Sequence, residues 1–469
     1  MARWDYDLLV IGLGPAGMAV AAMGSEMGLK VCAVEKNKIG GECMNVGCIP
    51  SKALLKTAEM RHYTKRMGNM ALGDCPEPDV GKVFNRIQSK LIYINDTKTT
   101  AMFKKVDLVL EQGPARFVDS NTVNVGDKKI TAKKIFICTG TRPAVPPIPG
   151  IETVDVLTNE NLFSLDKVPE SMVIIGGGAI GSEMAQAFSR LGSKISMVHM
   201  DDHLLPMGDR ELGDFIQKVF ESEGIQVFNG RKISGVAKEN GMIVVTTDKG
   251  ESLKGEKLLV AAGRKIVLDE LNLEAAQIAY TPKGITVNDH LQTSQPHIYA
   301  AGDCNGHFLL SHAAMHQGML ALINSMLPKP FRRNFKKYVV PWTVFTEPQV
   351  SAVGKSRKEL ERDKVKFEEV VARYDDYGAA IAEGIESGYV KAFISKFGKI
   401  LGAQVIGEGS GEMINEWGMA IQKKLRITDI MFLQHSFPSM SFLTKRVSES
   451  WMMNRMKSNW IKKMIRWVF

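Results

Sequence analysis

Two cysteines, Cys43 and Cys48, are the residues of this chain best placed to do chemistry. Four residues separate them, glycines precede them at 40 and 41, and Pro-Ser-Lys closes the segment at 50–52. That spacing brings both sulfurs to one side of the first turn of a helix. Because a helix N-terminus lowers the pKa of a thiol, it keeps a thiolate available for exchange or charge transfer. The segment predicts a redox-active pair; the alternative is two small buried hydrophobes.

The elements that position this pair are expected in more than one domain, because 469 residues exceed a single hydrophobic core. A composition of 45% hydrophobic and 24% charged residues is that of an ordinary globular protein. Six cysteines are too few for a disulfide scaffold and fit a reducing compartment. An apolar run starts at Tyr6, which leaves no room for a signal peptide, so we expect a cytoplasmic protein.

The formal net charge of +9 is concentrated near the C-terminus. Residues 445–469 hold seven basic residues and one acid, so this segment carries +6. The body of the protein is therefore close to neutral, and we expect no nucleic-acid partner.

A first dinucleotide-binding unit is predicted at the N-terminus. An apolar strand at 6–11 leads into a glycine turn, a helical segment reaches residue 28, and a second strand ends in Glu35. The glycines let a pyrophosphate approach the helix N-terminus, and Glu35 is placed for ribose hydroxyls. The turn is formed by Gly12, Gly14 and Gly17.

The same order of elements returns at 172–198, with Gly176, Gly178 and Gly181 in the turn. Two such folds imply two dinucleotides, with electrons passed between them. His199 stands where an NAD site usually has an acid, whereas Gly181 favours NAD and no arginine is placed for a 2′-phosphate. We therefore favour NAD over NADP.

Two further strands end in small-residue turns, Thr139-Gly140 and Gly302-Asp303. Such turns are where a backbone meets a ligand, and Asp303 is placed for a hydroxyl of a ribityl chain. The alternative for each is an ordinary turn.

Helical patterns are expected at 53–67 and 83–105. From residue 340 onward, alternating strands and helical stretches at 355–362 and 411–425 indicate a separate α+β domain.

Together these motifs resemble the flavin-dependent pyridine nucleotide–disulfide oxidoreductases, the group of dihydrolipoamide dehydrogenase, glutathione reductase and mercuric reductase. The resemblance extends to about residue 442 and includes the segments 43–52, 262–264 and 341–348. It implies an α/β fold with two Rossmann-like dinucleotide-binding domains, an α+β C-terminal dimerisation domain, and hence a homodimer. The implied bounds are 1–150 and 270–337 for the FAD domain, 151–269 for the NAD(P) domain, 338–444 for the dimerisation domain and 445–469 for a tail helix.

The resemblance also assigns roles. Cys48 is the thiol nearest the flavin, with which it forms a charge-transfer pair when reduced, and Cys43 exchanges with substrate. Lys52 lies beside flavin N5 and pairs with Glu183, and a cation there favours the reduced, anionic ring. No metal ligand is implied. The positions implied to hold FAD and NAD(P)H are Gly12, Gly14, Ala16, Gly17, Glu35, Lys36, Gly41, Glu42, Lys52, Ala115, Thr139, Gly140, Arg142, Gly176, Gly178, Ala179, Ile180, Gly181, His199, Gly263, Arg264, Gly302, Asp303, Leu310, Ser311 and His312.

The segment 435–442 departs from the family's pattern His-x-His-Pro-Thr-x-Ser-Glu, in which the second histidine, oriented by the glutamate, acts across the dimer on the dithiol. Phe437 stands at the position of this base and Phe442 at that of the acid. Loss of a base worth roughly 10²–10⁴ in rate argues against a small dithiol substrate, and two phenylalanines suit a flat apolar ligand. His435 either substitutes for the base or is a packing histidine.

Two smaller departures point the same way. Glu42 replaces a usual threonine beside Cys43, and we expect its carboxylate to raise the pKa of that thiol. Ala179 stands where the family often has a tyrosine that gates the nicotinamide side of the flavin. Mercuric reduction is disfavoured, because that branch carries a C-terminal cysteine pair and the last cysteine here is Cys304.

Residues 451–469 have the pattern of an amphipathic helix. Such a helix lies on an anionic membrane and is too short and too charged to span it. The alternative is packing on the protein's own surface or on a partner. The apolar face holds Met453, Met456, Trp460, Met464, Trp467 and Val468, and the basic residues Arg455, Lys462 and Arg466 lie opposite.

The sequence thus predicts an FAD-dependent NAD(P)H oxidoreductase, peripheral on the inner face of the membrane. Its Cys43–Cys48 disulfide would pass electrons to a quinone or a redox partner protein. One rival is a conventional dihydrolipoamide dehydrogenase-like reductase that uses His435. The other is a catalytically quiet, membrane-docked flavoprotein that senses redox state.

Overall fold

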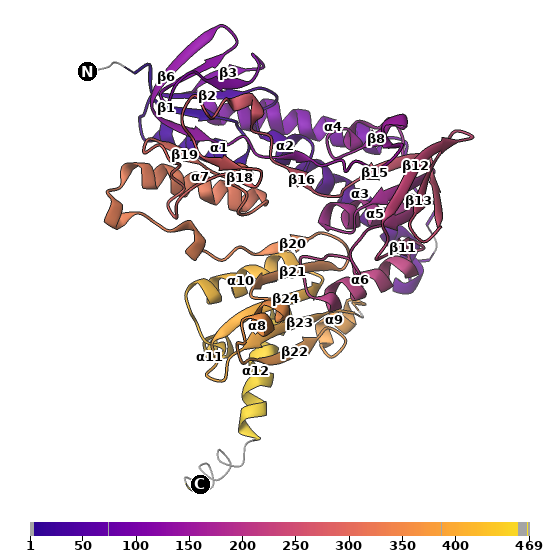
Figure 1. Ribbon diagram of the computed structural model, residues 1–469. Helices are drawn as coiled ribbons and strands as arrows, with labels where there is room; N and C mark the ends of the chain where they lie inside the picture. Colours follow the sequence, from indigo (N-terminus) through magenta and orange to yellow (C-terminus); the bar gives the residue numbers. More distant parts are fainter. Residues whose placement is uncertain (1–3, 74, 386, 458–466, 468–469) are drawn as a thin grey trace. The chain divides into compact units, whose positions relative to one another are not determined.

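The computed structural model describes residues 4–73, 75–385, 387–457 and 467 (Figure 1). The predicted mixed α/β architecture is confirmed. The chain divides into two compact units: unit 1 comprises Met1–Gly176, Ala187–Ser196 and Lys232–Lys337, and unit 2 comprises Gly177–Gln186, Met197–Arg231 and Tyr338–Phe469.

Unit 1 is built on a seven-stranded sheet with the path β3-β2-β1-β6-β5-β4, in which β19 also pairs with β6. Strands β1, β2, β3, β6 and β19 run parallel, which explains why β1 is a continuous apolar run rather than an alternating one. The bounds are β1 (Tyr6–Ile11), β2 (Val31–Glu35), β3 (Asp107–Leu110), β4 (Ala115–Phe117), β5 (Thr122–Val125), β6 (Lys128–Ile137) and β19 (Ile298–Ala300).

Helices α1 (Pro15–Glu26) and α7 (Ser311–Met326) pack closely in unit 1. A Cβ at Gly318 would lie 2.3 Å from the carbonyl oxygen of Ala16, so only glycine allows this approach. The other helices of unit 1 are α2 (Gly41–Asn45), α3 (Cys48–Arg66) and α4 (Val83–Tyr93). The single helix expected at 83–105 is instead three pieces, because a π-helix (Ile94–Thr99) and a 3₁₀-helix (Thr100–Phe103) follow α4.

The second predicted strand–turn–helix–strand order is also present. Strand β9 (Ser171–Ile175) leads through the glycine turn into α5 (Ala179–Arg190) and then β10 (Lys194–Val198). In unit 1, β9 and β8 (Val156–Leu157) both pair in parallel with β15 (Lys257–Val260). Small antiparallel sheets of unit 1 join β12 (Ile233–Glu239), β13 (Met242–Thr247) and β14 (Ser252–Gly255); β7 (Arg142–Pro143) and β16 (Arg264–Lys265); and β17 (Tyr280–Thr281) and β18 (Gly284–Ile285).

Unit 2 contains a five-stranded antiparallel sheet of order β20-β21-β24-β23-β22. Its inner face packs on helices around the fully buried Trp417, which forms the core of the α+β domain predicted after residue 340. The strands are β20 (Trp342–Val344), β21 (Gln349–Gly354), β22 (Glu368–Arg373), β23 (Tyr389–Ile394) and β24 (Ile400–Gly407). Unit 2 also holds β11 (Gln226–Phe228) and the helices α6 (Arg210–Ser222), α8 (Arg357–Arg362), α9 (Gly378–Ala382), α10 (Ser410–Gln422), α11 (Ile427–Phe432) and α12 (Phe442–Met456).

The prediction that Trp451 starts a tail outside the fold is wrong, because Trp451 lies on α12, which packs in unit 2. Trp451 is only 8% exposed and packs in the core of unit 2 with Leu443 and Val447. Arg455 lies over the Trp451 ring, 5.0 Å from its centroid, and pairs with Glu368 at 2.7 Å.

The predicted apolar face is exposed where the structure describes it: Met453 is 57% exposed, Met456 45% and Trp467 88%. Trp460, Lys462, Met464, Arg466 and Val468 lie outside the described residues. Among the helices that are described, none is both long and apolar enough to cross a membrane.

Candidate active site

The two cysteines lie on consecutive helices of unit 1. Cys43 is in α2 and Cys48 is the first residue of α3, so the expectation of a single helical turn is wrong. The break occurs at Gly47, where a Cβ would lie 2.8 Å from the carbonyl oxygen of Glu42. Neither cysteine is in a disulfide, and Cys48 Sγ lies 3.3 Å from Oγ of Ser311, the first residue of α7.

The pKa of Cys43 is raised, although not for the predicted reason. A hydrogen bond with Cys48 is the largest cause and burial adds to it, while the hydroxyl of Ser311 opposes the shift. Near neutral pH Cys43 is therefore a thiol rather than a thiolate.

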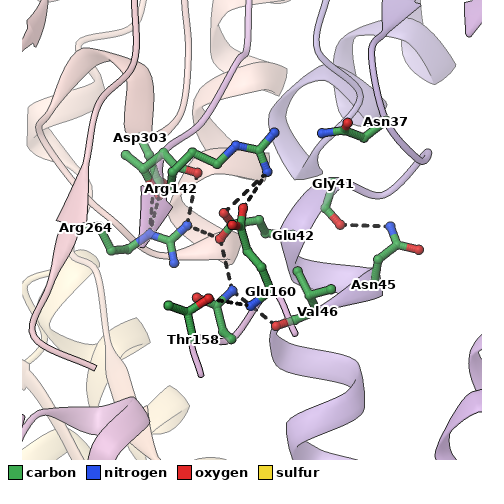
Figure 2. A network of polar contacts seen from close by, with 12 residues as sticks. Asn37, Gly41, Glu42, Asn45, Val46, Arg142, Thr158, Glu160, Arg264 and Asp303 are labelled. Atoms are coloured by element: carbon green, nitrogen blue, oxygen red, sulfur yellow. Dashed lines mark hydrogen bonds and ion pairs between the residues drawn. The ribbon is translucent and has the colours of Figure 1, made fainter. Parts of the chain in front are cut away.

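The carboxylate of Glu42 is occupied by arginine instead (Figure 2). It pairs with the guanidinium of Arg264, and Nη1 of Arg142 lies 3.8 Å from its other oxygen. Arg142 also contacts Glu160 at 2.9 Å, and Nε of Arg264 donates to Thr141 Oγ1 at 2.6 Å. Two cations thus neutralise Glu42, and the network joins the helix that carries Cys43 to the β7–β16 ladder.

The network continues to Asp303 at the turn after β19. Thr141 Oγ1 donates to its carboxylate at 2.8 Å, and Nε of Arg264 lies 3.8 Å away. Burial raises the pKa of Asp303, and the contacts with Thr141 and Arg264 lower it. Because β6 and β19 are parallel neighbours, the turns Thr139-Gly140 and Gly302-Asp303 leave the same edge of the sheet.

The first glycine turn has the geometry that a pyrophosphate needs. Gly17 must be glycine, because a Cβ there would lie 1.8 Å from the carbonyl oxygen of Gly12. At Gly14, the N-cap of α1, no described atom lies within 4 Å of a Cβ position, and the first turn of α1 carries no acid. Glu35 holds the turn, since its carboxylate accepts hydrogen bonds from the backbone N–H groups of Leu13 and Asn37, both at 2.8 Å. These residues fit the pyrophosphate and ribose of FAD.

The remaining residues proposed for FAD also belong to unit 1. Gly41 approaches the glycine turn, since a Cβ there would lie 2.9 Å from Cα of Gly14. Lys36 pairs with Glu270. Ala16 and Ala115 are buried, Gly263 precedes β16, and Leu310, Ser311 and His312 form the start of α7.

The second glycine turn is arranged for a nucleotide in the same way. Gly176 has a φ of +118°, and around Gly178 the described residues leave a Cβ position open. Ala179, Ile180 and Gly181 begin α5, whose first turn has no acid.

His199 follows β10, but its side chain is turned inward. It is 4% exposed, and its Nε2 lies 2.6 Å from Oδ1 of Asn229. Its ring fills the space above Gly177, where a Cβ would lie 2.6 Å from Nε2. Its Nδ1 is also buried and has no hydrogen-bond partner among the described residues, so a contact of His199 with a ribose stays a prediction.

Lys52 and Glu183 are the remaining predicted catalytic residues. Lys52 lies one turn after Cys48 on α3 in unit 1. Glu183 is buried on α5 in unit 2, where it accepts a hydrogen bond from the backbone N–H of Phe345 at 3.0 Å. Their pairing stays a prediction.

The two phenylalanines of the C-terminal segment are in contact, and a third ring joins them. Phe437 meets Phe442 edge to face, with centroids 5.4 Å apart, and Phe442 stacks on Tyr377 at 6.0 Å. Tyr377 is buried, whereas Phe437 is 71% exposed. No local pattern indicates Tyr377 as a partner, because it lies far from both phenylalanines along the chain. We call these three rings the aromatic cluster.

His435 is engaged elsewhere. Its Nε2 lies 2.9 Å from Oε1 of Glu416 on α10, and its Nδ1 lies 3.4 Å from the carbonyl oxygen of Leu433. Both ring nitrogens therefore have partners within unit 2, as expected of a packing histidine. Glu416, 19 residues before His435, is likewise not indicated by any local pattern.

The fold and the site together define an oxidoreductase with two dinucleotide-binding glycine turns and a pair of neighbouring cysteines. The chain belongs to the pyridine nucleotide-disulphide oxidoreductase family, whose model matches residues 6–318, and the dimerisation domain of that family matches residues 340–446. It is accordingly an FAD-dependent enzyme that uses NAD(P)H.

Curated relatives include the mercuric reductase of Bacillus cereus, 31% identical over 91% of this chain and 68% of the relative. The dihydrolipoyl dehydrogenase of Mycoplasma pneumoniae is 32% identical over 91% of this chain and 94% of the relative. Among solved structures, the flavoprotein disulfide reductase RclA of Escherichia coli, as a Cu(II) complex, superposes with a TM-score of 0.85 at 26% identity, covering 95% of this chain and 99% of that one.

Proposed function

We propose that this chain forms a homodimer that passes electrons from NAD(P)H through the Cys43–Cys48 disulfide to an apolar acceptor, a quinone or a redox protein at a membrane. The first glycine turn and Glu35 would hold FAD, which would supply two-electron transfer between NAD(P)H and the disulfide. For a quinone the reaction balances as NAD(P)H, one proton and quinone giving NAD(P)⁺ and quinol. We infer that NADH is preferred over NADPH, because Asp201 lies 3.8 Å from His199 Nδ1 and would repel a 2′-phosphate.

The aromatic cluster carries this proposal. A thiol substrate near neutral pH needs a base, whereas the residue in that register is Phe437, packed on Phe442. A flat ring system is a suitable partner for an exposed aromatic face, because offset or edge contacts between rings are favourable. His435, the rival base, already contacts Glu416 and Leu433.

The homodimer is supported by apolar side chains that unit 2 exposes within the dimerisation domain. Phe432 is 77% exposed, Met419 60% and Leu433 50%. Apolar groups at this exposure are typical of an interface rather than of a solvated surface.

The membrane part of the proposal is supported by the charge of residues 445–469 and by the exposed Met453, Met456 and Trp467. Because Trp451 belongs to the core, the tail is tested by deleting 458–469 rather than 445–469. We expect the full chain to float with anionic liposomes and the shortened chain to remain in the dense fraction. Equal flotation of both proteins would contradict the membrane role.

The decisive experiment is an anaerobic titration of the holoenzyme with NADH and, separately, NADPH, followed by turnover with menadione, lipoamide, glutathione disulfide and Cu(II). We expect the flavin to bleach, with NADH the better donor, and turnover with menadione to exceed that with lipoamide or glutathione disulfide. Phe437→Ala should lower menadione turnover, whereas Phe397→Ala should leave it unchanged, because the Phe397 side chain is 75% exposed and belongs neither to the aromatic cluster nor to the proposed dimer surface. Brisk lipoamide turnover would refute the proposed acceptor, and a flavin that stays oxidised would favour the quiet, redox-sensing rival.

A further inference from the structure

The N-termini of α3 and α7, both in unit 1, lie close to the sulfur atom of Cys48. Cys48 is the first residue of α3, Ser311 is the first residue of α7, and Cys48 Sγ lies 3.3 Å from Ser311 Oγ. In a neutral thiol–hydroxyl pair either group can donate, whereas a thiolate only accepts. Once Cys48 loses its proton, Ser311 is therefore the donor of this hydrogen bond.

The ends of these helices favour that charge. Throughout α3 and α7, which are fully described, neither first turn contains an acid, and neither Gly47 nor Leu310 caps its helix with a side chain. The helices have 19 and 16 residues, so both have a full dipole whose positive end is not neutralised by its own first turn. A thiolate at Cys48 is the anion that both ends stabilise.

The second sulfur is held in the opposite protonation state. Contact with Cys48 and burial raise the pKa of Cys43, and Ser311 hydrogen-bonds to this thiol as well. The Ser311 hydroxyl therefore contacts both sulfurs: it lies 3.3 Å from Cys48 Sγ, and its contact with Cys43 only partly opposes the rise in the pKa of Cys43.

We propose that Ser311 is a positioning residue of the dithiol, whose hydroxyl donates to Cys48 and keeps the negative charge on that sulfur after reduction. The inference rests on the proposed redox function of the pair. Oxidation of NAD(P)H supplies two electrons and one proton: the S–S bond breaks, the proton goes to Cys43 Sγ, and Cys48 Sγ keeps the charge. Cys43 is then the neutral thiol.

Other charged groups near Cys48 are common to the wild type and the test variants. The titratable side chains at the adjoining ends of the three helices are Glu42 and Cys43 on α2, Lys52 on α3 and His312 on α7. Glu42 is neutralised by Arg264. A change in the pH profile of Cys48 in Ser311→Ala is therefore attributed to loss of the Ser311 hydroxyl.

The test measures the two sulfurs separately. Holoenzyme is reduced with dithiothreitol, alkylated with iodoacetamide over a range of pH, and each cysteine is quantified by peptide mass spectrometry. We expect Ser311→Ala to move the Cys48 profile up by about one pH unit, a roughly tenfold loss of thiolate near neutral pH. The potential of the pair, measured against a dithiothreitol redox buffer, should become about 30 mV more negative, which is that tenfold change for two electrons.

Two further variants separate the hydroxyl from a general disturbance. Ser311→Thr retains the donor and should restore both values. Ser51→Ala is the matched control: Ser51 lies on the first turn of α3, but its hydroxyl donates to the backbone oxygen of Cys48 at 3.2 Å, so the sulfur should be unaffected.

An unchanged Cys48 profile in Ser311→Ala, or an equal shift in Ser51→Ala, would overturn the proposal. Because dithiothreitol reduces the pair directly, this outcome is independent of the NAD(P)H titration. If NAD(P)H fails to reduce the disulfide while Ser311→Ala still shifts the profile, the proposed function fails and the role of Ser311 stands.

Discussion

His435 and Glu416 form a partly buried pair in unit 2, with 2.9 Å between Nε2 and Oε1; 4% of the imidazole side chain and 21% of the Glu416 side chain are exposed. The pair ties the segment before Phe437 to α10. The pair gives His435 a carboxylate partner of its own, two residues before Phe437.

Replacing His435 should therefore affect stability more than chemistry. We expect His435→Gln to lower the free energy of unfolding by about 1–2 kcal/mol, because Glu416 loses its partner, while NAD(P)H oxidation is unchanged. Urea unfolding and steady-state rates measure the two effects. Loss of thiol turnover at unchanged stability would instead identify His435 as a base.

Restoring the family's dyad should restore thiol chemistry. We expect the double variant Phe437→His with Phe442→Glu to gain at least about tenfold in lipoamide turnover, part of the roughly 10²–10⁴ that a positioned base contributes. Turnover with menadione should fall in the same protein, because the aromatic cluster is lost. If both rates stay constant, the cluster does not select the acceptor.

The arginines around Glu42 should make its charge important to stability. Glu42 is 14% exposed and Arg264 20%, so we expect Glu42→Gln to cost about 2–4 kcal/mol by leaving a half-buried guanidinium without its carboxylate. Glu160→Gln is the matched control: its side chain is 42% exposed and touches the same network only through Arg142, so about 0–1 kcal/mol is expected. Equal losses in urea unfolding would contradict this account.

The reactivity of Cys43 should depend on its neighbour. Because contact with Cys48 is the largest cause of its raised pKa, its alkylation rate in reduced enzyme should still rise with pH above about 8.5, the ordinary value for a thiol. In Cys48→Ala the Cys43 profile should move to lower pH. The exposed Cys75 serves as internal reference, and its profile should be the same in both proteins. An identical Cys43 profile in the two would exclude Cys48 as the cause.

Trp451 should behave as a core residue and Met453 as a surface one. We expect Trp451→Ala to lower the free energy of unfolding by about 3–5 kcal/mol, whereas Met453→Ala should change it by no more than about 0.5 kcal/mol. Comparable effects would mean that α12 does not pack as the structure describes.

The parts that could be predicted are those whose signal is local. The apolar run of β1, the glycines of both turns and the strand β10 follow from spacing and side-chain type within a few residues. Gly47 was available as a signal for the break between α2 and α3, but the regular spacing of the two cysteines favoured one helix instead.

Contacts between distant segments could not be predicted in this way. Nothing near Tyr377 indicates that it stacks on Phe442, and nothing near Glu42 indicates that Arg264 neutralises it. The spacing of apolar residues around Trp451 is the same whether this face of the helix contacts a lipid or the sheet of unit 2. The burial of Trp451 depends on where α12 packs, and the spacing of apolar residues does not indicate this.

At Gly318, helix α7 lies against the backbone of helix α1. The middle of α7 rests against the backbone of α1 at Ala16, and the first residue of α7 is the serine beside Cys48. Because α1 starts at the first glycine turn and α7 starts at Ser311, their contact at Gly318 relates the position of that turn to the position of the hydroxyl beside Cys48.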